Sequence, residues 1–576
     1  NNNAYYNSFK YLGQINSVDY STTELIQTQL GDTNGIFADP LPDNFGYSGC
    51  KYLGGKGLPT YVNSDIDLNV ISGTPDIGAS SIQDAPALNG TVTVGSTGDY
   101  TSLDAALQDL MSRGIAAPTT LWLQSGVHLI NKRLGYVPNT LSHSLTISGA
   151  DNAWIYGSGE SAATNYALAL KATRNLVLDG LRITNQSMNY SRGVTLDRYN
   201  ENLSIQNCHF ALDPNNLDTD QSSAIYAYNV IAQDFNIQSC QIDNYSRGIY
   251  YSGNTSYPEA SSGLLIMGNS IQGASTGIFI YAANAPQIIA NQIGTWRNMG
   301  VNFSGNRGAA RIERNDISGS GYYALNVSNH QSGDTRPTIA TNHLRCASTG
   351  WAYSLNLDSS VNVDVFFNTI VMASLSSSAV AFGQSSSSTG LSFANNLVRG
   401  GGSYAAVFAS LGTLSRLDHN LFFTNSGAAV RLGVTDISNL AAWIGATGDN
   451  SSLFADPQIV ADGYTWPVGS PVWNAGIEIP GFAYDITANL RDNPDIGCWE
   501  YAVMGIETPV NLQISIDPVS SEVLLSWDPV AGASSYKVWY AASPDAASWS
   551  FVNVNDPSAR LAASSTQRFY KVTAVN

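Results

Sequence analysis

The chain has 576 residues, with 26 Lys and Arg against 44 Asp and Glu, and its formal net charge is −18. This excess of negative charge repels nucleic-acid phosphates and anionic membrane surfaces, so neither is expected as a partner. Charged residues make up only 12% of the sequence, and no apolar run approaches the roughly 18 residues that span a bilayer, so membrane insertion is not expected either.

Three short sequences near the N-terminus recur late in the chain at an offset of about 418 residues, as expected of a tandem array. Residues 3–6 resemble 420–423, residues 37–40 repeat as 454–457, and residues 75–78 repeat as 494–497. We therefore expect residues 1–88 to be the last coil and closing tail of a preceding module. The expected partners are neighbouring modules of the same polypeptide or copies of the chain itself.

A new module is predicted to begin near residue 89 with a strand and a short helix. Residues 101–104 read as a helix N-cap with an acidic partner three positions on. An apolar stripe follows, and Gly114 is the expected stop. The stripe consists of Ala105, Leu107, Leu110 and Met111. Such a helix would cover the open end of a solenoid, where unpaired strand edges invite further strands.

A six-residue motif then recurs, as at 312–317. Its first and last positions are apolar, its fourth position is usually Asn, and the other three positions are spacers. A coil of this kind brings the chain back one strand spacing higher, roughly 4.8 Å along the axis. Amides at equivalent bends can then bond to one another. The fourth positions of the motif are Cys208, Cys240, Asn269, Asn291, Asn315, Asn342, Asn368, Asn396 and Asn420. We predict a parallel β-helix over residues 89–425 with these residues as a ladder.

The two cysteines at the start of this column should stack on adjacent coils. A disulfide between Cys208 and Cys240 is geometrically conceivable, and two unbridged thiols are the simpler interpretation.

The second strand of each coil alternates between inward and outward residues. Ile225, Ile249 and Ile278 are expected to point inward. Their neighbours should form an outward, stacked aromatic patch with a polar stripe directly below it. The patch consists of Tyr226, Tyr228, Tyr250, Phe279 and Tyr281, and the stripe includes Asn302 and Asn326. Exposed rings and amides on a rigid sheet suit a polysaccharide or cell-surface glycan, and stacked rings can also simply stabilise a sheet.

The evidence for catalysis is weak. Glu313 and Asp364, with Arg311 nearby, are the best candidate acids, and two coils separate them by roughly 10 Å. Paired carboxylates in glycosidases lie about 5 to 9.5 Å apart. The Asp-pair, Gly-His-Gly and Arg-Ile-Lys pattern of polygalacturonases is absent from the sequence.

No cofactor is expected, and calcium is the one metal considered. Asp213, Asp218 and Asp220 crowd one loop without a neighbouring Lys or Arg. Carboxylate oxygens of this kind suit calcium, and an ordinary acidic loop is the simpler interpretation.

Beyond the ladder, residues 426–505 lose the period and are expected to be a closing tail. Residues 506–576 change character again and show short alternating strands. Leu-Ser-Trp-Asp at 525–528, Tyr-Lys-Val-Trp-Tyr at 536–540 and the strand at 569–576 resemble strands B, C and F of a fibronectin type III sandwich. The chain stops where a final strand of that sandwich would be expected, so we expect either that the domain lacks this strand or that the true C-terminus lies further on.

Together, the ladder coils, the capping helix and the Asp-Ile-Gly motif at 495–497 resemble the pectin-lyase-like right-handed parallel β-helix proteins of the bacterial secreted or surface type. The resemblance implies an all-β fold and an extracellular location at the bacterial surface. That family includes polysaccharide lyases and members without known chemistry, so the fold alone assigns no activity. We expect a non-catalytic stalk, filament segment or adhesin that binds glycan. The alternative is a polysaccharide lyase or glycoside hydrolase.

Overall fold

The computed structural model describes residues 85–575 with internal gaps, together with four short N-terminal strands. The gaps are 131–132, 158–165, 186–190, 198, 213–221, 257–260, 332, 334, 426, 461, 502–507, 521, 531–532, 545, 547 and 564–567. The chain forms two compact units. The first consists of Asn1–Pro457 with Ile496–Cys498, and the second of Gln458–Asp495 with Trp499–Asn576.

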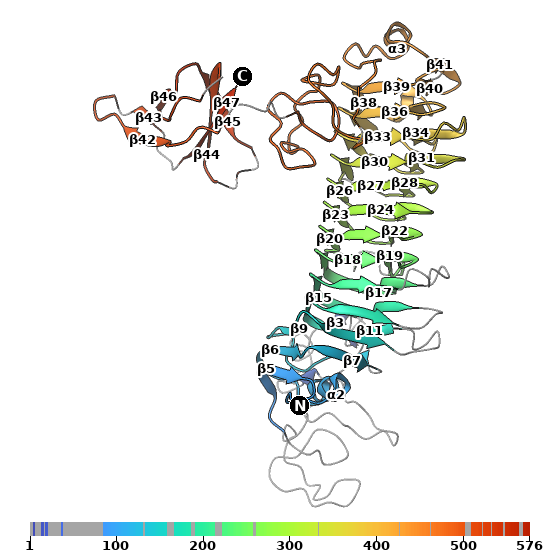
Figure 1. Ribbon diagram of the computed structural model, residues 1–576, viewed down its shortest axis with the longest axis vertical. Helices are drawn as coiled ribbons and strands as arrows, with labels where there is room; N and C mark the ends of the chain where they lie inside the picture. The colour runs from blue at the N-terminus through green and yellow to red at the C-terminus, as the bar shows by residue number, and fades with distance from the viewer. Residues whose placement is uncertain are drawn as a thin grey trace, which may run out of the picture. The chain divides into compact units, whose positions relative to one another are not determined.

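The first unit contains a parallel β-helix, which confirms the predicted fold class. Each coil adds one strand to each of three faces, and these strands pair in parallel with the coils before and after (Figure 1). The second face is a twelve-stranded sheet, and the long strand β17 (Ser223–Gln238) joins the first and third faces into one sheet. Hydrogen bonds between coils therefore run along the axis of the solenoid.

The strands of each face follow one another in chain order. The first face consists of β5 (Leu88–Val94), β6 (Ile115–Leu123), β9 (Leu145–Gly149), β12 (Arg174–Asp179), β15 (Tyr199–Gln206), the end of β17, β20 (Leu265–Met267), β23 (Gln287–Ile289), β26 (Arg311–Glu313), β29 (Thr338–Ala340), β32 (Asp364–Phe366), β35 (Leu391–Ala394) and β38 (Leu414–Asp418). The second face consists of β7 (Gly126–Ile130), β10 (Ala153–Gly157), β13 (Arg182–Asn185), β16 (His209–Ala211), β18 (Gln241–Asp243), β21 (Ser270–Gln272), β24 (Gln292–Trp296), β27 (Asp316–Gly319), β30 (His343–Cys346), β33 (Thr369–Met372), β36 (Leu397–Gly400) and β39 (Leu421–Thr424). The third face consists of β8 (Arg133–Leu134), β11 (Tyr166–Lys171), β14 (Arg192–Asp197), the start of β17, β19 (Arg247–Gly253), β22 (Thr276–Tyr281), β25 (Met299–Ser304), β28 (Tyr323–Ser328), β31 (Ala352–Asp358), β34 (Ala379–Gln384), β37 (Ala406–Phe408), β40 (Val430–Leu432) and β41 (Thr435–Ile437).

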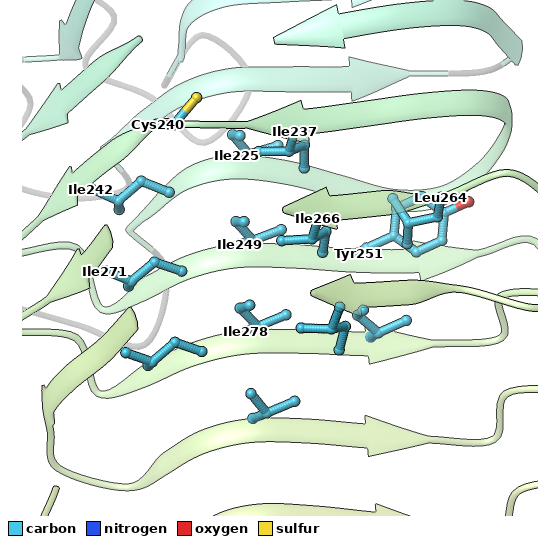
Figure 2. Packing of buried hydrophobic residues seen from close by; sticks show 14 of the residues in the cluster. Ile225, Ile237, Cys240, Ile242, Ile249, Tyr251, Leu264, Ile266, Ile271 and Ile278 are labelled. Atoms are coloured by element: carbon cyan, nitrogen blue, oxygen red, sulfur yellow. The ribbon is translucent and has the colours of Figure 1, made fainter. Parts of the chain in front are cut away.

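Inward side chains of the three faces meet in one continuous apolar core. Ile225, Ile249 and Ile278 of the third face are fully buried and lie in file, as the alternation predicted (Figure 2). Branched residues from the other two faces pack against this file, among them Ile237, Ile242, Ile266 and Ile271. Burying each such side chain stabilises the fold by about 1.5–3 kcal/mol.

The bend between the first and second faces carries the asparagine ladder. The Nδ2 group of Asn291 donates to Oδ1 of Asn315 at 3.0 Å, and Nδ2 of Asn315 donates to Oδ1 of Asn342 at 3.0 Å. The same bonds link Asn342 to Asn368 and continue to Asn396 and Asn420, at 2.9 to 3.2 Å. At the far end of the ladder, the backbone amide of Asn420 donates to Oγ of Ser452 at 2.9 Å, so Ser452 takes the place of a further asparagine.

Every residue immediately before a ladder position has a left-handed backbone. Its φ lies between 50° and 66° in all nine coils, although only one of the nine residues is glycine. The residues are Asn207, Ser239, Gly268, Ala290, Arg314, Thr341, Phe367, Asn395 and His419. This conformation aims the following side chain along the axis, where it meets the next coil.

Cys208 and Cys240 start the column as buried, unbridged thiols. The Sγ of Cys240 donates to the Ile205 carbonyl at 3.6 Å, while Asn269 Oδ1 accepts from the Cys240 amide at 2.9 Å. The two cysteines are therefore unbridged, as the simpler interpretation of the sequence predicted.

Helices cover both ends of the solenoid. At one end α2 (Leu103–Arg113) begins at Ser102, whose side chain accepts from the Ala105 amide, and it buries an apolar stripe beside β5 and β6. At the other end α3 (Leu440–Thr447) buries Trp443 against Phe408 and Phe422. The solenoid thus runs past residue 425, where the ladder motif ends, because strands and a helix without that motif complete its last coil.

The described N-terminal strands repeat the pairing of this last coil. β2 (Gly13–Ile15) and β3 (Val18–Tyr20) form an antiparallel hairpin with Gly13 opposite Tyr20, and β40 and β41 pair Val430 with Ile437. β1 (Ala4–Tyr5) pairs in parallel with β4 (Ile36–Phe37), and Leu421 bridges Leu453 in the same sense. Each N-terminal strand lies about 417 residues before its counterpart.

The second unit contains two three-stranded antiparallel sheets. One is formed by β42 (Gln513–Ile516), β43 (Glu522–Ser526) and β46 (Ser558–Ala562), and the other by β44 (Ser535–Ala541), β45 (Ser550–Val554) and β47 (Phe569–Val575). A small core that includes Leu525, Trp527 and Val538 is buried here. Strands lie where the sequence indicated them, and the assignment to the fibronectin type III class stays a prediction.

Candidate functional site

The third face of the solenoid carries outward side chains in columns, because the strands pair in register. Tyr226 lies opposite Tyr250, Tyr250 opposite Phe279, and Phe279 opposite Asn302. The column continues with Asn326 and Asn356. We call this file from Tyr226 to Asn356 the central column. The structure therefore places the aromatic patch and the polar stripe in a single line along the axis.

The three rings of the central column stack on one another. The ring centroids of Tyr226 and Tyr250 are 5.1 Å apart, and those of Tyr250 and Phe279 are 4.7 Å apart, with interplanar angles of 13° and 8°. Stacking covers most ring faces, so the edges and hydroxyls of this stack point to solvent. Burial also raises the pKa of Tyr250, which keeps its phenol neutral. The expected stacking of sugars on these rings is therefore limited to the ends of the stack.

The polar part of the central column is a second ladder, which lies on the outside. The Nδ2 group of Asn326 donates to Oδ1 of Asn302 at 2.9 Å, and Nδ2 of Asn356 donates to Oδ1 of Asn326 at 2.8 Å. In the next column, Ser328 Oγ donates to Ser304 Oγ at 2.9 Å. These amides are fixed by one another, so they present an ordered strip for hydrogen bonding.

Two aromatic side chains on the flank of the central column are the most exposed of the predicted patch. Tyr228 is 60% exposed and Tyr281 is 37% exposed. The Tyr228 ring lies 6.4 Å from that of Tyr226, and Tyr281 lies close against Gly305, where a Cβ would meet the ring at 2.7 Å. These rings offer the larger free aromatic surface.

Two open grooves flank the strand β22. The first has a volume of about 310 Å³, and it lies beside Phe279 and Tyr250. Its walls also carry hydroxyls, an amide and a guanidinium, from Ser275, Thr276, Asn302 and Arg247. The second has a volume of about 300 Å³ and is lined by residues that include Tyr281, Ser304, Arg307 and Gln331. Phe279 and Tyr281 are two residues apart on one strand, so one ring borders each groove.

Two arginines lie against the stacked rings of the central column. The Cζ atom of Arg192 lies 3.5 Å from the centroid of the Tyr226 ring, and Cζ of Arg247 lies 4.7 Å from that of Tyr250. Burial, followed by the neighbouring charge of Arg247, lowers the pKa of Arg192. The sequence patterns singled out neither residue, although the position of Arg247 three residues before the outward Tyr250 was a usable signal.

A second aromatic cluster, also missed, lies further along the same face. Tyr323 and Tyr353 stack with centroids 6.1 Å apart, and the Trp351 ring meets both edge-on. Trp351 is 47% exposed. These tyrosines lie in register with Met299, in the column next to the central one. The sequence alternation indicated outward rings only in the central column and in the column on its other side.

The candidate catalytic acids are each paired with an arginine. Arg311 contacts Glu313 on the same strand through two bonds of 2.9 and 2.7 Å. Asp364 lies in the column of Arg311 and is bound by Arg336 at 2.6 Å. Glu313 lies in the adjacent column, opposite Ala340. Both carboxylates are occupied by these ion pairs, and the structure does not bring them together across one groove.

Asp213, Asp218 and Asp220, considered for calcium, lie outside the described residues. Across the described part of the chain, no group of three or more His, Cys, Asp or Glu side chains is arranged to hold a metal ion. Within the same residues, no helix is both long and apolar enough to span a bilayer.

No family model matches the chain, and no curated protein matches it either. Among solved structures it is similar to PfbA, a surface adhesin of Streptococcus pneumoniae, at 14% identity and a TM-score of 0.41, over 57% of this chain and 86% of that one. It is also similar to the pectate lyase Pel9A, at 13% identity and a TM-score of 0.32, over 73% and 98%.

A mutant of the PL6 family alginate lyase AlyGC is similar at 10% identity and a TM-score of 0.37, over 73% of this chain and 60% of that one. Adhesins and polysaccharide-cleaving enzymes thus both occur among the similar structures. At these TM-scores the likenesses carry no argument about function.

Proposed function

We propose that this chain is an extracellular, non-catalytic adhesive module that binds a polysaccharide or cell-surface glycan on the third face of its solenoid. The observation that carries the proposal is the pair of grooves on either side of Phe279 and Tyr281. Apolar ring surface beside convergent hydroxyls and amides is the usual composition of a small-molecule site. Because both rings stand on one strand of a paired sheet, the site is rigid before a ligand arrives.

The repeated strand pairing at the N-terminus supports a tandem arrangement of such modules. Residues 1–88 would then belong to a preceding solenoid, and residues 458–501 would be the corresponding tail of this one. Repeated weak sites on one polypeptide raise the overall avidity without any new contact. A glycan on a cell surface is a repetitive ligand that suits this arrangement.

The alternative, a polysaccharide lyase or glycoside hydrolase, is less well supported. Hydrolysis of a glycosidic bond canonically needs two carboxyl groups that flank one bond. Glu313 and Asp364 are each neutralised by an arginine and lie in different columns on the first face. Incubation with neutral and acidic polysaccharides tests this alternative, since appearance of reducing or unsaturated ends that requires Glu313 and Asp364 would contradict the proposal.

The binding proposal predicts the effect of removing the two rings. In a Phe279→Ala, Tyr281→Ala variant, retention on a glycan array should fall about five- to thirtyfold, because ring contacts of this type contribute about 1–2 kcal/mol in total at a site. Retention is measured with the full chain at matched concentration.

The control is Tyr484→Ala, which removes a tyrosine that is 50% exposed in the second unit. Its retention should equal that of the parent, and thermal unfolding should show that the solenoid of the double variant remains folded. Equal retention by the folded double variant, or no retention of any glycan by the parent, would show that the rings serve packing only.

A further inference from the structure

We propose that Arg192 and Arg247 form a site for an oxyanion, a carboxylate or a sulfate ester, carried by the ligand of the third face. This inference rests on the glycan-binding function proposed above and specifies the chemical class of the glycan.

The two arginines occupy equivalent positions on the third face. Arg192 lies opposite Ser223, and Ser223 lies opposite Arg247, so the three residues form a column beside the stacked rings. Each guanidinium lies against a ring of the stack, and these two rings are themselves only 5.1 Å apart. Arg247 also lines the groove of about 310 Å³. Two cations are therefore held side by side at the edge of the candidate binding groove.

Neither cation has a counter-charge among the described residues. Among the residues that the structure describes, no carboxylate pairs with Arg192 or Arg247, although the chain carries a net charge of −18. Three other outward arginines of the solenoid, Arg311, Arg336 and Arg416, do pair with a carboxylate. The mutual effect of the two cations is visible in the pKa of Arg192, which burial and the Arg247 charge both lower. A bound anion would relieve this repulsion.

Buried polar atoms at the same place lack hydrogen-bond partners. Within the described part of the molecule, Nε of Arg192, Oγ of Ser223 and Oγ1 of Thr195 are buried and make no hydrogen bond. Thr195 lies opposite Tyr226, so all three atoms surround one corner of the aromatic stack. Unsatisfied buried groups are rare in native proteins and call for an explanation such as a missing ion or water. A cluster of them beside two unpaired arginines indicates a site that is completed by a ligand.

Guanidinium geometry favours an oxyanion over a neutral group. The planar fork of arginine matches the two oxygens of a carboxylate or sulfate, and such charge-assisted bonds are about twice as strong as neutral ones. Hydroxyls and amides of the neighbouring groove, from Ser275, Thr276 and Asn302, can bind the sugar that carries the anion. Specificity for an acidic or sulfated glycan follows from this combination.

The first experiment probes the anion alone. The full chain is titrated with sodium sulfate against sodium chloride at equal ionic strength, and the midpoint of thermal unfolding is followed. We expect a saturable rise of the midpoint for the parent and for Arg345→Gln, which removes an outward arginine of the second face. The double variant Arg192→Gln, Arg247→Gln should show only the gradual, non-saturating rise of the unfolding midpoint that sulfate causes in proteins generally. Arg247→Gln alone provides the same comparison if the double variant does not fold.

The second experiment identifies the source of the anion with three polymers that share one backbone. These are chondroitin sulfate, desulfated chondroitin, and desulfated chondroitin whose carboxyl groups have been reduced. We expect the parent to bind at least one charged form about tenfold more tightly than the neutral form, and Arg247→Gln to remove that preference. Preference for the first polymer indicates a sulfate ester, and equal binding of the first two indicates a carboxylate.

The outcomes separate this inference from the proposal on which it rests. Equal binding of charged and neutral polymers, unchanged by Arg247→Gln, would overturn the anion site and leave glycan binding in place. Saturable stabilisation by sulfate that needs both arginines, without retention of any glycan, would support the anion site and overturn the glycan proposal. A sulfate response that is the same in the parent and the arginine variants would contradict the inference directly.

Discussion

The residue before each ladder position adopts a conformation that most side chains avoid. A left-handed backbone costs a residue with a Cβ about 1–2 kcal/mol, and glycine escapes this cost. Ala290, Arg314 and Thr341 nevertheless hold φ values of 54° to 58°. Ladder bonds on the next residue offset the cost, because Asn291 and its equivalents satisfy buried groups of two coils at once. The turn is thus stabilised by the asparagine that follows it rather than by glycine.

This balance predicts an unusual response to glycine. Ala290 is exposed and its φ is 54°, so Ala290→Gly should raise the free energy of unfolding by up to about 1 kcal/mol, because relief of the left-handed strain exceeds the entropy that glycine costs. Chemical denaturation measures the change. The matched substitution Ala441→Gly, in the exposed part of helix α3, should lower stability by about 1 kcal/mol. If both Ala290→Gly and Ala441→Gly lowered the free energy of unfolding, the turn at Ala290 would carry no backbone strain.

At the scale of the coil, the ladder is the element that keeps the three faces in register. Each amide joins its own coil to both neighbours: Asn315 donates to the Ile288 carbonyl at 2.8 Å and accepts from the Asn291 amide at 2.9 Å. The outward ladder of Asn302, Asn326 and Asn356 has the same spacing and lies partly in solvent, where water can replace its bonds. The two ladders should therefore differ in what they contribute to stability.

Substitution of one asparagine in each ladder measures that difference. Asn315→Ala should lower the free energy of unfolding by about 3 kcal/mol or more, since it leaves buried backbone and amide groups without partners. Asn326→Ala, in the outward ladder, should cost less than about 1 kcal/mol. Thermal and chemical unfolding of both variants provide the comparison. If Asn315→Ala and Asn326→Ala lowered the free energy of unfolding by similar amounts, burial would not determine how much a ladder contributes to stability.

Sequence patterns predicted the coils well because the same constraint acts in each one. The period-two alternation placed Ile225, Ile249 and Ile278 inward, and the recurring asparagine placed the bends. The patterns indicated that the rings of Tyr226 and Tyr250 stack, but they did not reveal that Tyr228 stays the most exposed ring, because exposure depends on which rotamers neighbouring coils select. Arg192 and Arg247 were overlooked for a related reason, since a lone arginine in a strand shows no partner, or lack of one, until the register is known.

At the scale of the whole molecule, the second unit differs from the solenoid in its chemistry. It buries three carboxylates, Asp485, Asp495 and Glu500, together with the cation Arg491. Arg491 Nη1 donates to Glu500 at 3.3 Å, and the Asp495 amide donates to the same carboxyl at 3.0 Å. Burial, followed by the charge of Asp495, raises the pKa of Glu500 to about 8 against an ordinary value of 4.5.

A raised carboxyl pKa makes the second unit sensitive to pH. Because the folded state holds the Glu500 proton more tightly than the unfolded state, its contribution to stability is full below about pH 4.5 and is lost as pH rises to about 8. Chemical denaturation of the full chain, followed by the signal of the second unit, should show this decline between the two values. Glu500→Gln, which mimics the neutral form, should flatten it. An unchanged slope in that variant would assign the dependence to other groups.

The alignment of hydrogen bonds along the solenoid axis has a mechanical consequence if the module acts as the proposed adhesin. Tension applied along that axis loads the bonds between coils one rung after another, so the end coils would peel away first. A released coil of the ladder region frees the 22 to 28 residues between successive asparagines, which can extend by roughly 3.3–3.6 Å per residue. The module would thus lengthen stepwise under load and dissipate mechanical energy before the proposed contact with the glycan is broken.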